Sequence, residues 1–318
     1  STKSTRCFNE RRTPTMIHAI HANRIRPDKG SRSFSILGYI VMAAITLICL
    51  LPFWLMVSGS LSDETTVLTE GFKLWPNPFS LDAYRAIFQG WDKIASAYGI
   101  TMLVTLVGTF IALLITSMTG YVLQRQDFAP RNKVSFFFYF TTLFSGGVIP
   151  TYILIVNYLN LKDNLLALIL PGMLTPWFIM LMRNFIKSIP FTIIEAAKID
   201  GAGDWRIYMH IVLPLSKAGL ATIGLFIALN YWNDWYHASL YINSEALYPL
   251  QYLLYRMLSN AEYMKQAAAA GVFLEGAAMP TETLKMATAI VVTGPILLLY
   301  PFIQRYFVKG IMIGGVKG

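Results

Sequence analysis

Charged residues are scarce in this chain. They make up 14% of its 318 residues, whereas 55% of the residues are hydrophobic. A soluble domain carries about a quarter charged residues, so much of this chain must face something other than water. The length alone suggests about two domains, but the apolar residues recur in long blocks along the whole chain, which favours one membrane domain.

Cysteine and histidine are also rare, with two and four residues respectively. Cys7 lies in a basic tail and Cys49 inside an apolar block, so we expect no disulfide between them. The histidines show no metal-ligand spacing, and we expect no metal site. A Gly-rich loop ending in Gly-Lys-Ser/Thr, the hallmark of a phosphate-binding loop, is absent as well. We therefore expect no cofactor on this chain.

Six long apolar stretches dominate the sequence instead. A spanning helix needs ~20 mostly apolar residues to cross the hydrocarbon of a bilayer. Backbone groups in lipid must be paired internally, and continuous runs favour helices over barrel strands. The first run is longer than the ~7–15 residues of a signal peptide core, which favours a retained anchor. We predict an all-α integral membrane protein with about six transmembrane helices, near 36–57, 98–123, 135–158, 165–182, 220–242 and 286–302.

Lysine and arginine are distributed unevenly between the two sides that this topology defines. Of the 26 such residues, 19 fall on the side that holds both termini. The positive-inside rule makes that side the cytoplasm, and the bias explains the net charge of +9 without nucleic acid. We expect a basic cytoplasmic tail at 1–35, a membrane domain at 36–307 and a cytoplasmic tail at 308–318. Met16 is a candidate natural start, so whether residues 1–15 are native stays open.

The longest cytoplasmic connection, residues 188–216, begins with a helix pattern. Thr192 is followed three residues later by Glu195, the spacing of a capping box, which predicts that a helix begins there. Gly201 suits the left-handed residue that commonly ends a helix. Taken alone, Glu195 could be simply a cap and Gly201 simply a turn.

A second short helix follows in the same connection. Asp204, or Gly203, can cap it, and it is expected to run up to Pro214. The two helices predict a helix–turn–helix projection on the basic side of the membrane. Ala196 and Ala197 leave the first helix without bulk, so another protein could approach it closely.

The spacing of this connection reads Glu-Ala-Ala, three residues, Gly, nine residues, then Ile-x-Leu-Pro. It resembles the signature loop of permease subunits of binding-protein-dependent ATP-binding cassette (ABC) importers. In that family the loop is a coupling helix seated in a groove on the ATP-hydrolysing subunit. The resemblance therefore implies ATPase-coupling roles for Glu195, Ala196, Ala197, Asp200, Gly201, Leu213 and Pro214.

The resemblance extends over nearly the whole chain after residue 36. The ending from Pro295 to Gly310 is similar to the carbohydrate-uptake branch, and most of all to the second, six-span permease of maltose-type importers. This implies transport of oligosaccharides, some of which contain uronic acids in this branch. It also implies a bacterial cytoplasmic (inner) membrane location and several partners: a second homologous permease subunit, two ATPase subunits that carry ATP and Mg, and an extracytoplasmic solute-binding protein.

A second informative segment lies inside the fifth predicted span. An ionisable residue in hydrocarbon costs ~2.5 kcal/mol or more unless it faces protein or water, and Asp234 is the only acid that we place within a span. Aromatic rings and amides around it are suited to sugar faces and hydroxyls. The substrate-pathway residues that we infer are Asn230, Tyr231, Trp232, Asn233, Asp234 and Trp235. An interfacial aromatic belt with an inter-helix hydrogen-bond cluster is the alternative, and the sequence leaves it open.

Two other function classes make different demands on the sequence. A secondary transporter for a polar solute would couple to an ion through intramembrane acids, but only Asp234 is available and the cytoplasmic projection would be unexplained. An intramembrane enzyme needs paired catalytic groups at membrane depth, and the predicted spans contain no Ser/His, His-Glu or paired-Asp set. The sequence therefore favours a non-enzymatic permease subunit.

Overall fold

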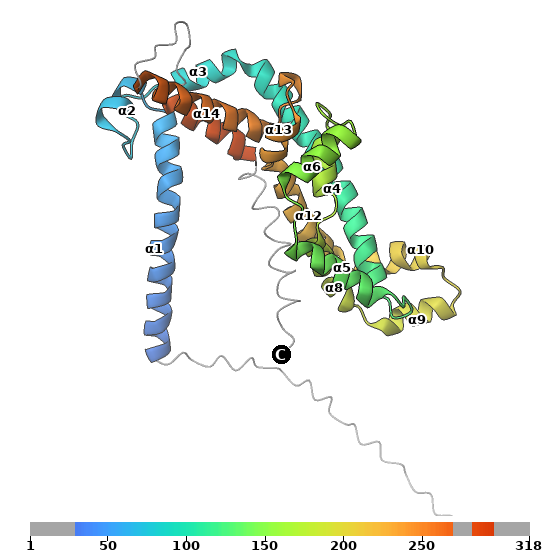
Figure 1. Cartoon of the computed structure of the whole chain (residues 1–318). Helices are drawn as coiled ribbons and strands as arrows, with labels where there is room; N and C mark the ends of the chain where they lie inside the picture. Colours follow the sequence, from blue (N-terminus) through green and yellow to red (C-terminus); the bar gives the residue numbers. More distant parts are fainter. Residues whose placement is uncertain (1–28, 270–281, 296–318) are drawn as a thin grey trace, which may run out of the picture. The chain divides into compact units, whose positions relative to one another are not determined.

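The computed structural model describes residues 29–269 and 282–295, and these residues are almost entirely helical (Figure 1). Apart from one isolated bridge between Ser62 and Phe79, they form helices and their connections. The chain divides into two units, residues 1–52 and 53–318. The predicted all-α class is confirmed, while both predicted tails and the end of the sixth predicted span lie largely outside the described residues.

The described part of the first unit, residues 29–52, belongs to one long helix, α1 (Lys29–Ser60). This helix begins before residue 36, where we expected the tail to end. Its segment Phe34–Ser60 is long and apolar enough to cross a membrane. The same holds for α4 (Trp91–Gln124), which contains the second predicted span.

The other predicted spans within the described residues are broken rather than continuous. The third comprises α5 (Arg131–Leu143) and then α6 (Val148–Ile153) with η1 (Leu154–Tyr158), bent by 111°. Gly147 has a φ of +85° between the two halves, a conformation that glycine adopts without strain. The fourth comprises α7 (Leu166–Ile169) with η2 (Leu170–Gly172) and then α8 (Pro176–Lys187), bent by 52°.

The fifth predicted span, 220–242, also ends early. Helix α12 (Lys217–Trp232) stops at Trp232, and α13 (Tyr236–Tyr241) begins after a short break. The reason is local, because the Asp234 carboxylate accepts the His237 backbone N–H and so starts a new helix. A third bent pair precedes this break, since the helical stretch Asp204–Leu215 meets α12 at 81°. Counting each of the three bent pairs as one span, the described residues hold up to five spans by length and composition. The predicted total of six stays a prediction.

The remaining elements lie before, between and after these spans. They are α2 (Glu64–Glu70), α3 (Asp82–Gln89), α9 (Phe191–Ile199), α10 (Asp204–Ile207), η3 (Tyr208–Val212), α11 (Leu213–Leu215), η4 (Glu245–Leu247), α14 (Leu250–Ala269) and a helical segment at 282–295. The Glu64 carboxylate accepts the backbone N–H groups of Glu282 and Thr283, at 2.9 Å each. It thereby caps the helical segment 282–295 from a distant point in the sequence.

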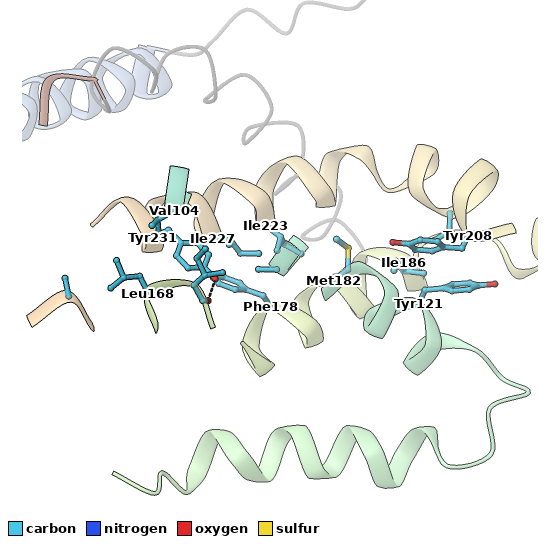
Figure 2. Packing of buried hydrophobic residues seen from close by; sticks show 14 of the residues in the cluster. Val104, Tyr121, Leu168, Phe178, Met182, Ile186, Tyr208, Ile223, Ile227 and Tyr231 are labelled. Carbon is cyan, nitrogen blue, oxygen red and sulfur yellow. Dashed lines mark hydrogen bonds between the residues drawn. The ribbon is translucent and has the colours of Figure 1, made fainter. Parts of the chain in front are cut away.

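The core of the second unit lies where α4, α8 and α12 pack together (Figure 2). Helix α4 meets its neighbours through small residues spaced four apart, the pattern by which membrane helices approach closely. These residues are all buried: Gly108, Ala112, Thr116 and Gly120. A Cβ at position 120 would lie 3.0 Å from the Met182 side chain, so glycine sets the distance between α4 and α8 there.

Candidate functional site

The helix of the expected coupling loop is α9. It begins at Phe191 after Pro190, and no side chain caps its first turn. The predicted capping box is therefore wrong: Thr192 already lies inside the helix, because the fixed backbone of Pro190 provides the entry instead. Ile194 is buried against the core, whereas Glu195 and Ala196 are exposed.

The turn after α9 is the one that the sequence predicts. Gly201 has a φ of +78°. Its N–H donates to the Lys198 carbonyl at 3.0 Å, and the Ala202 N–H donates to the Ala197 carbonyl at 2.9 Å. These two bonds satisfy carbonyls that would otherwise be orphaned at the helix end. Asp200 lies exposed at this end of the helix.

The second helix is longer than predicted, because α10, η3 and α11 follow one another and pass through Pro214 to Leu215. A π-helical turn makes this possible. Pro214 has no N–H to donate, and in the turn before it the Leu213 N–H donates back to the Tyr208 carbonyl. Leu213 is half-buried and Pro214 is exposed. Helices α9 to α11 and their turn are called the knuckle below.

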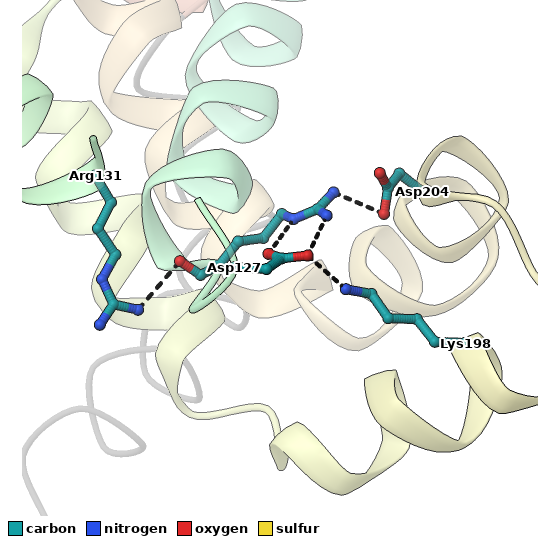
Figure 3. A network of polar contacts seen from close by, with 5 residues as sticks. Asp127, Arg131, Lys198 and Asp204 are labelled. Carbon is teal, nitrogen blue, oxygen red and sulfur yellow. Dashed lines mark hydrogen bonds and ion pairs between the residues drawn. The ribbon is translucent and has the colours of Figure 1, made fainter. Parts of the chain in front are cut away.

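Four charged side chains join the knuckle to the end of α4 (Figure 3). Arg125, directly after α4, contacts Asp204 of α10 at 2.6 Å and donates through Nε to Asp127 at 2.8 Å. Lys198 of α9 contacts the same Asp127 carboxylate at 2.7 Å. The hydrogen bond from Arg125, followed by that from Lys198, holds the pKa of Asp127 well below its ordinary value. Sequence reasoning missed this network, because its members are up to 79 positions apart.

Two apolar side chains on the knuckle point outward. Ile199, at the end of α9, is 87% exposed, and Trp205 of α10 is 57% exposed. Glu195 and Asp200 beside them take part in no ion pair within the described part of the chain. Exposed apolar residues ringed by polar ones are typical of a surface that binds another protein. The sequence could have indicated these two residues, since Ile199 and Trp205 flank the turn that joins the two helices of the knuckle.

The predicted substrate-pathway residues lie near the end of α12, where the structure has a cleft of about 490 Å³. Four of the six predicted residues line it, namely Asn230, Tyr231, Asn233 and Asp234. Pro171, Gly172 and Thr175, from the break in the fourth predicted span, form the opposite side. The two broken helices thus meet at one cleft with both polar and apolar lining residues, and helix breaks are tolerated in a membrane where they line a cavity.

The other two predicted residues lie elsewhere. The Trp232 ring packs with Ala83, Ile87 and their neighbours, away from the cleft. The Trp235 ring stacks on Tyr255 of α14, with ring centroids 4.2 Å apart. Trp232 is the last residue of α12, whereas Trp235 lies in the break before α13, so the break directs the two rings to different neighbours.

Tyr231 is mainly a packing residue, although its edge reaches the cleft. The side chain is 5% exposed, and its hydroxyl donates to the Ile169 carbonyl at 2.8 Å (Figure 2). A Cβ on Gly108 or Gly172 would lie within 3 Å of its ring. The ring is therefore enclosed between α4 and the broken fourth helix.

His237 also lines the cleft, although it was not among the predicted site residues. Its Nδ1 lies 2.7 Å from the Asp234 Oδ2, and its backbone N–H donates to Oδ1 of the same carboxylate at 3.1 Å. The pair gives the Asp234 carboxylate the partner that we expected for an acid placed within a span, although Asp234 lies in the break after α12. The sequence could have indicated this pairing, because His237 follows Asp234 by three residues, a spacing at which two side chains can meet.

Comparisons with known proteins agree with these features. Residues 128–313 match the family described as "Binding-protein-dependent transport system inner membrane component". The chain is 41% identical over 291 residues to the polygalacturonan/rhamnogalacturonan transport system permease protein YtcP of Bacillus subtilis, covering 91% of this chain and 99% of the relative. It is 36% identical to the protein LplC of the same organism, covering 95% and 99%.

A solved structure shares the fold. It is a chain of a bacterial ABC transporter involved in the import of the acidic polysaccharide alginate, with a TM-score of 0.75 and 27% identity, covering 88% of this chain and 98% of that one. The chain belongs to the inner membrane components of binding-protein-dependent transport systems and is a permease subunit of an ABC importer.

Proposed function

We propose that this permease subunit moves oligosaccharides, including ones that carry uronic acids, into the bacterial cytoplasm, and that a separate ATPase subunit drives it through the knuckle. The observation that carries this proposal is the knuckle itself. It presents exposed Ile199 and Trp205 while four charges fasten it to α4. The chain has no phosphate-binding loop of its own, so ATP and Mg belong to the partner.

The substrate class is supported from two sides. Polygalacturonan and alginate, which appear in the names of the similar proteins, are both polymers of acidic sugars. The cleft brings amides and a carboxylate together with apolar walls, the mixture that small-molecule sites in proteins generally use. Asn230 and Asn233 can donate to and accept from sugar hydroxyls.

The partners follow from the family and from the exposed surfaces. We propose a second homologous permease subunit, two ATPase subunits seated on the knuckles, and an extracytoplasmic solute-binding protein that delivers the oligosaccharide. Both termini and the knuckle lie in the cytoplasm in this arrangement. The knuckle's contacts must differ between two nucleotide states of the ATPase, because a ligand shifts an equilibrium only through differential affinity.

The test is uptake by the reconstituted complex. The permease is purified with the subunits that accompany it, inserted into liposomes and supplied with the binding protein and radiolabelled tetragalacturonate. We expect accumulation that requires ATP and is unaffected by dissipating ion gradients. Uptake that follows an ion gradient without ATP would instead support the ion-coupled alternative, for which the Asp234–His237 pair would be the coupling group.

A further inference from the structure

A line of aromatic rings leads away from the cleft along α13 and onto α14. His237, which lines the cleft, is followed by Tyr236 and then Trp235, with ring centroids 5.8 and 6.0 Å apart. From Trp235 the line crosses to Tyr255 at 4.2 Å. It then continues to Tyr252 of α14 at 6.4 Å and to Tyr248, which precedes α14, at 4.8 Å. These rings are called the aromatic rail: His237, Tyr236, Trp235, Tyr255, Tyr252 and Tyr248.

The middle of the rail is open. Trp235 is 38%, Tyr236 42% and Tyr255 41% exposed. A ring whose only task is packing is normally buried, as Tyr241 of α13 is at 1%. The stacked Trp235–Tyr255 pair therefore presents aromatic surface outside the core.

The far end of the rail is cationic. The Arg256 guanidinium lies over the Tyr248 ring, 5.0 Å from its centroid, and donates to the Tyr248 hydroxyl. Among the described residues it pairs with no carboxylate. Arg256 lines a small cavity of about 150 Å³, in which the other cation, Lys93, is already paired with Glu245 at 3.1 Å. The guanidinium thus has donors to offer a ligand.

We propose that the rail and Arg256 form an extended binding subsite for an acidic oligosaccharide, which leads the sugar chain toward the cleft. This inference rests on the proposed function. The exposed rings of Trp235, Tyr236 and Tyr255 can accept the apolar faces of sugar rings. Tyr248 is only 7% exposed, and its part is to support Arg256. A guanidinium held over a ring binds a carboxylate through parallel hydrogen bonds, which an ammonium cannot match. In this subsite the aromatic rail binds the sugar rings, and Arg256 binds the carboxylates that the sugar rings carry.

Two other occupants are compatible with exposed aromatic rings, namely lipid headgroups and the second permease subunit. The rail differs from an interfacial belt because it links two cavities, of about 490 and 150 Å³, and ends on a cation that has no carboxylate partner in the described part of the chain. A belt requires neither feature. Lipid and protein occupants nevertheless predict different outcomes in the experiment below.

The experiment compares two probes in the reconstituted complex, tetragalacturonate and its fully methyl-esterified form, which carries no charge. For Arg256→Gln we expect KM for the acid to rise about tenfold, as fits the loss of one charge-assisted hydrogen bond, with little change for the ester. Arg256→Lys should lie between the wild type and Arg256→Gln. The double variant Trp235→Ala/Tyr255→Ala should raise KM for both probes. The increase should be larger for these tetramers than for the corresponding dimers, which span fewer rings of the rail.

The matched control is Phe140→Ala/Phe144→Ala. These rings of the third predicted span are also stacked, with centroids 4.5 Å apart, and are 44% and 64% exposed, but they lie outside the rail. The control should leave both KM values unchanged. Equal losses for acid and ester in Arg256→Gln, or loss of the second subunit on purification of the rail variants, would overturn the proposal. A wild-type complex that takes up neither probe would instead count against the proposed function.

Discussion

At the scale of single residues, Gly201 carries a conformation that other residues adopt only with strain. Its φ is +78°, and a Cβ would meet nothing within 4 Å, so a substitution costs backbone strain alone. We expect Gly201→Leu to destabilise the turn by about 1–2 kcal/mol. The protein should still insert into the membrane, but transport per ATP hydrolysed should fall.

The measurement for this turn is the ratio of uptake to ATPase rate in liposomes. Gly203→Ala is the matched control, because Gly203 also has open space around it but a φ of −67°, which alanine adopts freely. Wild-type uptake in Gly201→Leu would refute a coupling role for the turn.

The charge network makes a prediction about pH. The pKa of Asp127 is depressed in the folded chain by the hydrogen bonds from Arg125 and Lys198. The stabilisation is therefore fully present above the unfolded-state pKa of ~3.9 and is lost as the pH falls through the lower folded-state value. We expect the knuckle's resistance to protease to be constant from pH 8 to pH 5, and we expect Asp127→Asn to weaken it throughout that range. A wild-type resistance that declines between pH 7 and pH 5 would point to another group.

At the scale of elements, the close contact between α4 and α12 depends on a glycine, Gly108, which has no side chain to separate the two helices. A Cβ at position 108 would lie 2.7 Å from the Tyr231 ring, which cannot retreat because Gly172 lies on its other side. We expect Gly108→Ala to lower the stability of the detergent-solubilised protein by about 1–3 kcal/mol through overpacking. Its thermal unfolding midpoint is the measurement.

Gly99→Ala is the control for this contact, since it lies on the same helix with nothing within 4 Å. Alanine is the better helix former, so this variant should be as stable as the wild type or slightly more so. Similar losses in both variants would mean that helix propensity, and not packing on Tyr231, sets the cost.

At the scale of the whole molecule, the proposed topology places the knuckle and the loop that follows α13 on opposite sides of the membrane. We expect Asn243→Cys to react with a membrane-impermeant maleimide in intact cells. Gly203→Cys should react only after the membrane is permeabilised. The background is a Cys7→Ser/Cys49→Ser chain, and both labelling positions are exposed. The reverse pattern of labelling would exclude cytoplasmic coupling.

The features that the sequence determined by itself are those set by neighbouring residues. Long apolar runs require helices in lipid wherever they occur in the chain. The left-handed turn at Gly201 likewise depends on the few residues around it. The same local reasoning failed at Thr192, where two adjacent signals competed and the backbone of Pro190 decided the helix start.

Tertiary structure alone decided what depends on residues distant in the sequence. It separated Trp232 from the cleft that Asn230 and Asp234 line, and it brought Trp235 onto Tyr255 of another helix. It also joined Arg125 to Asp204 across 79 positions. The physical reason is that a side chain's direction follows from its helix, but what it meets there follows from how the helices pack.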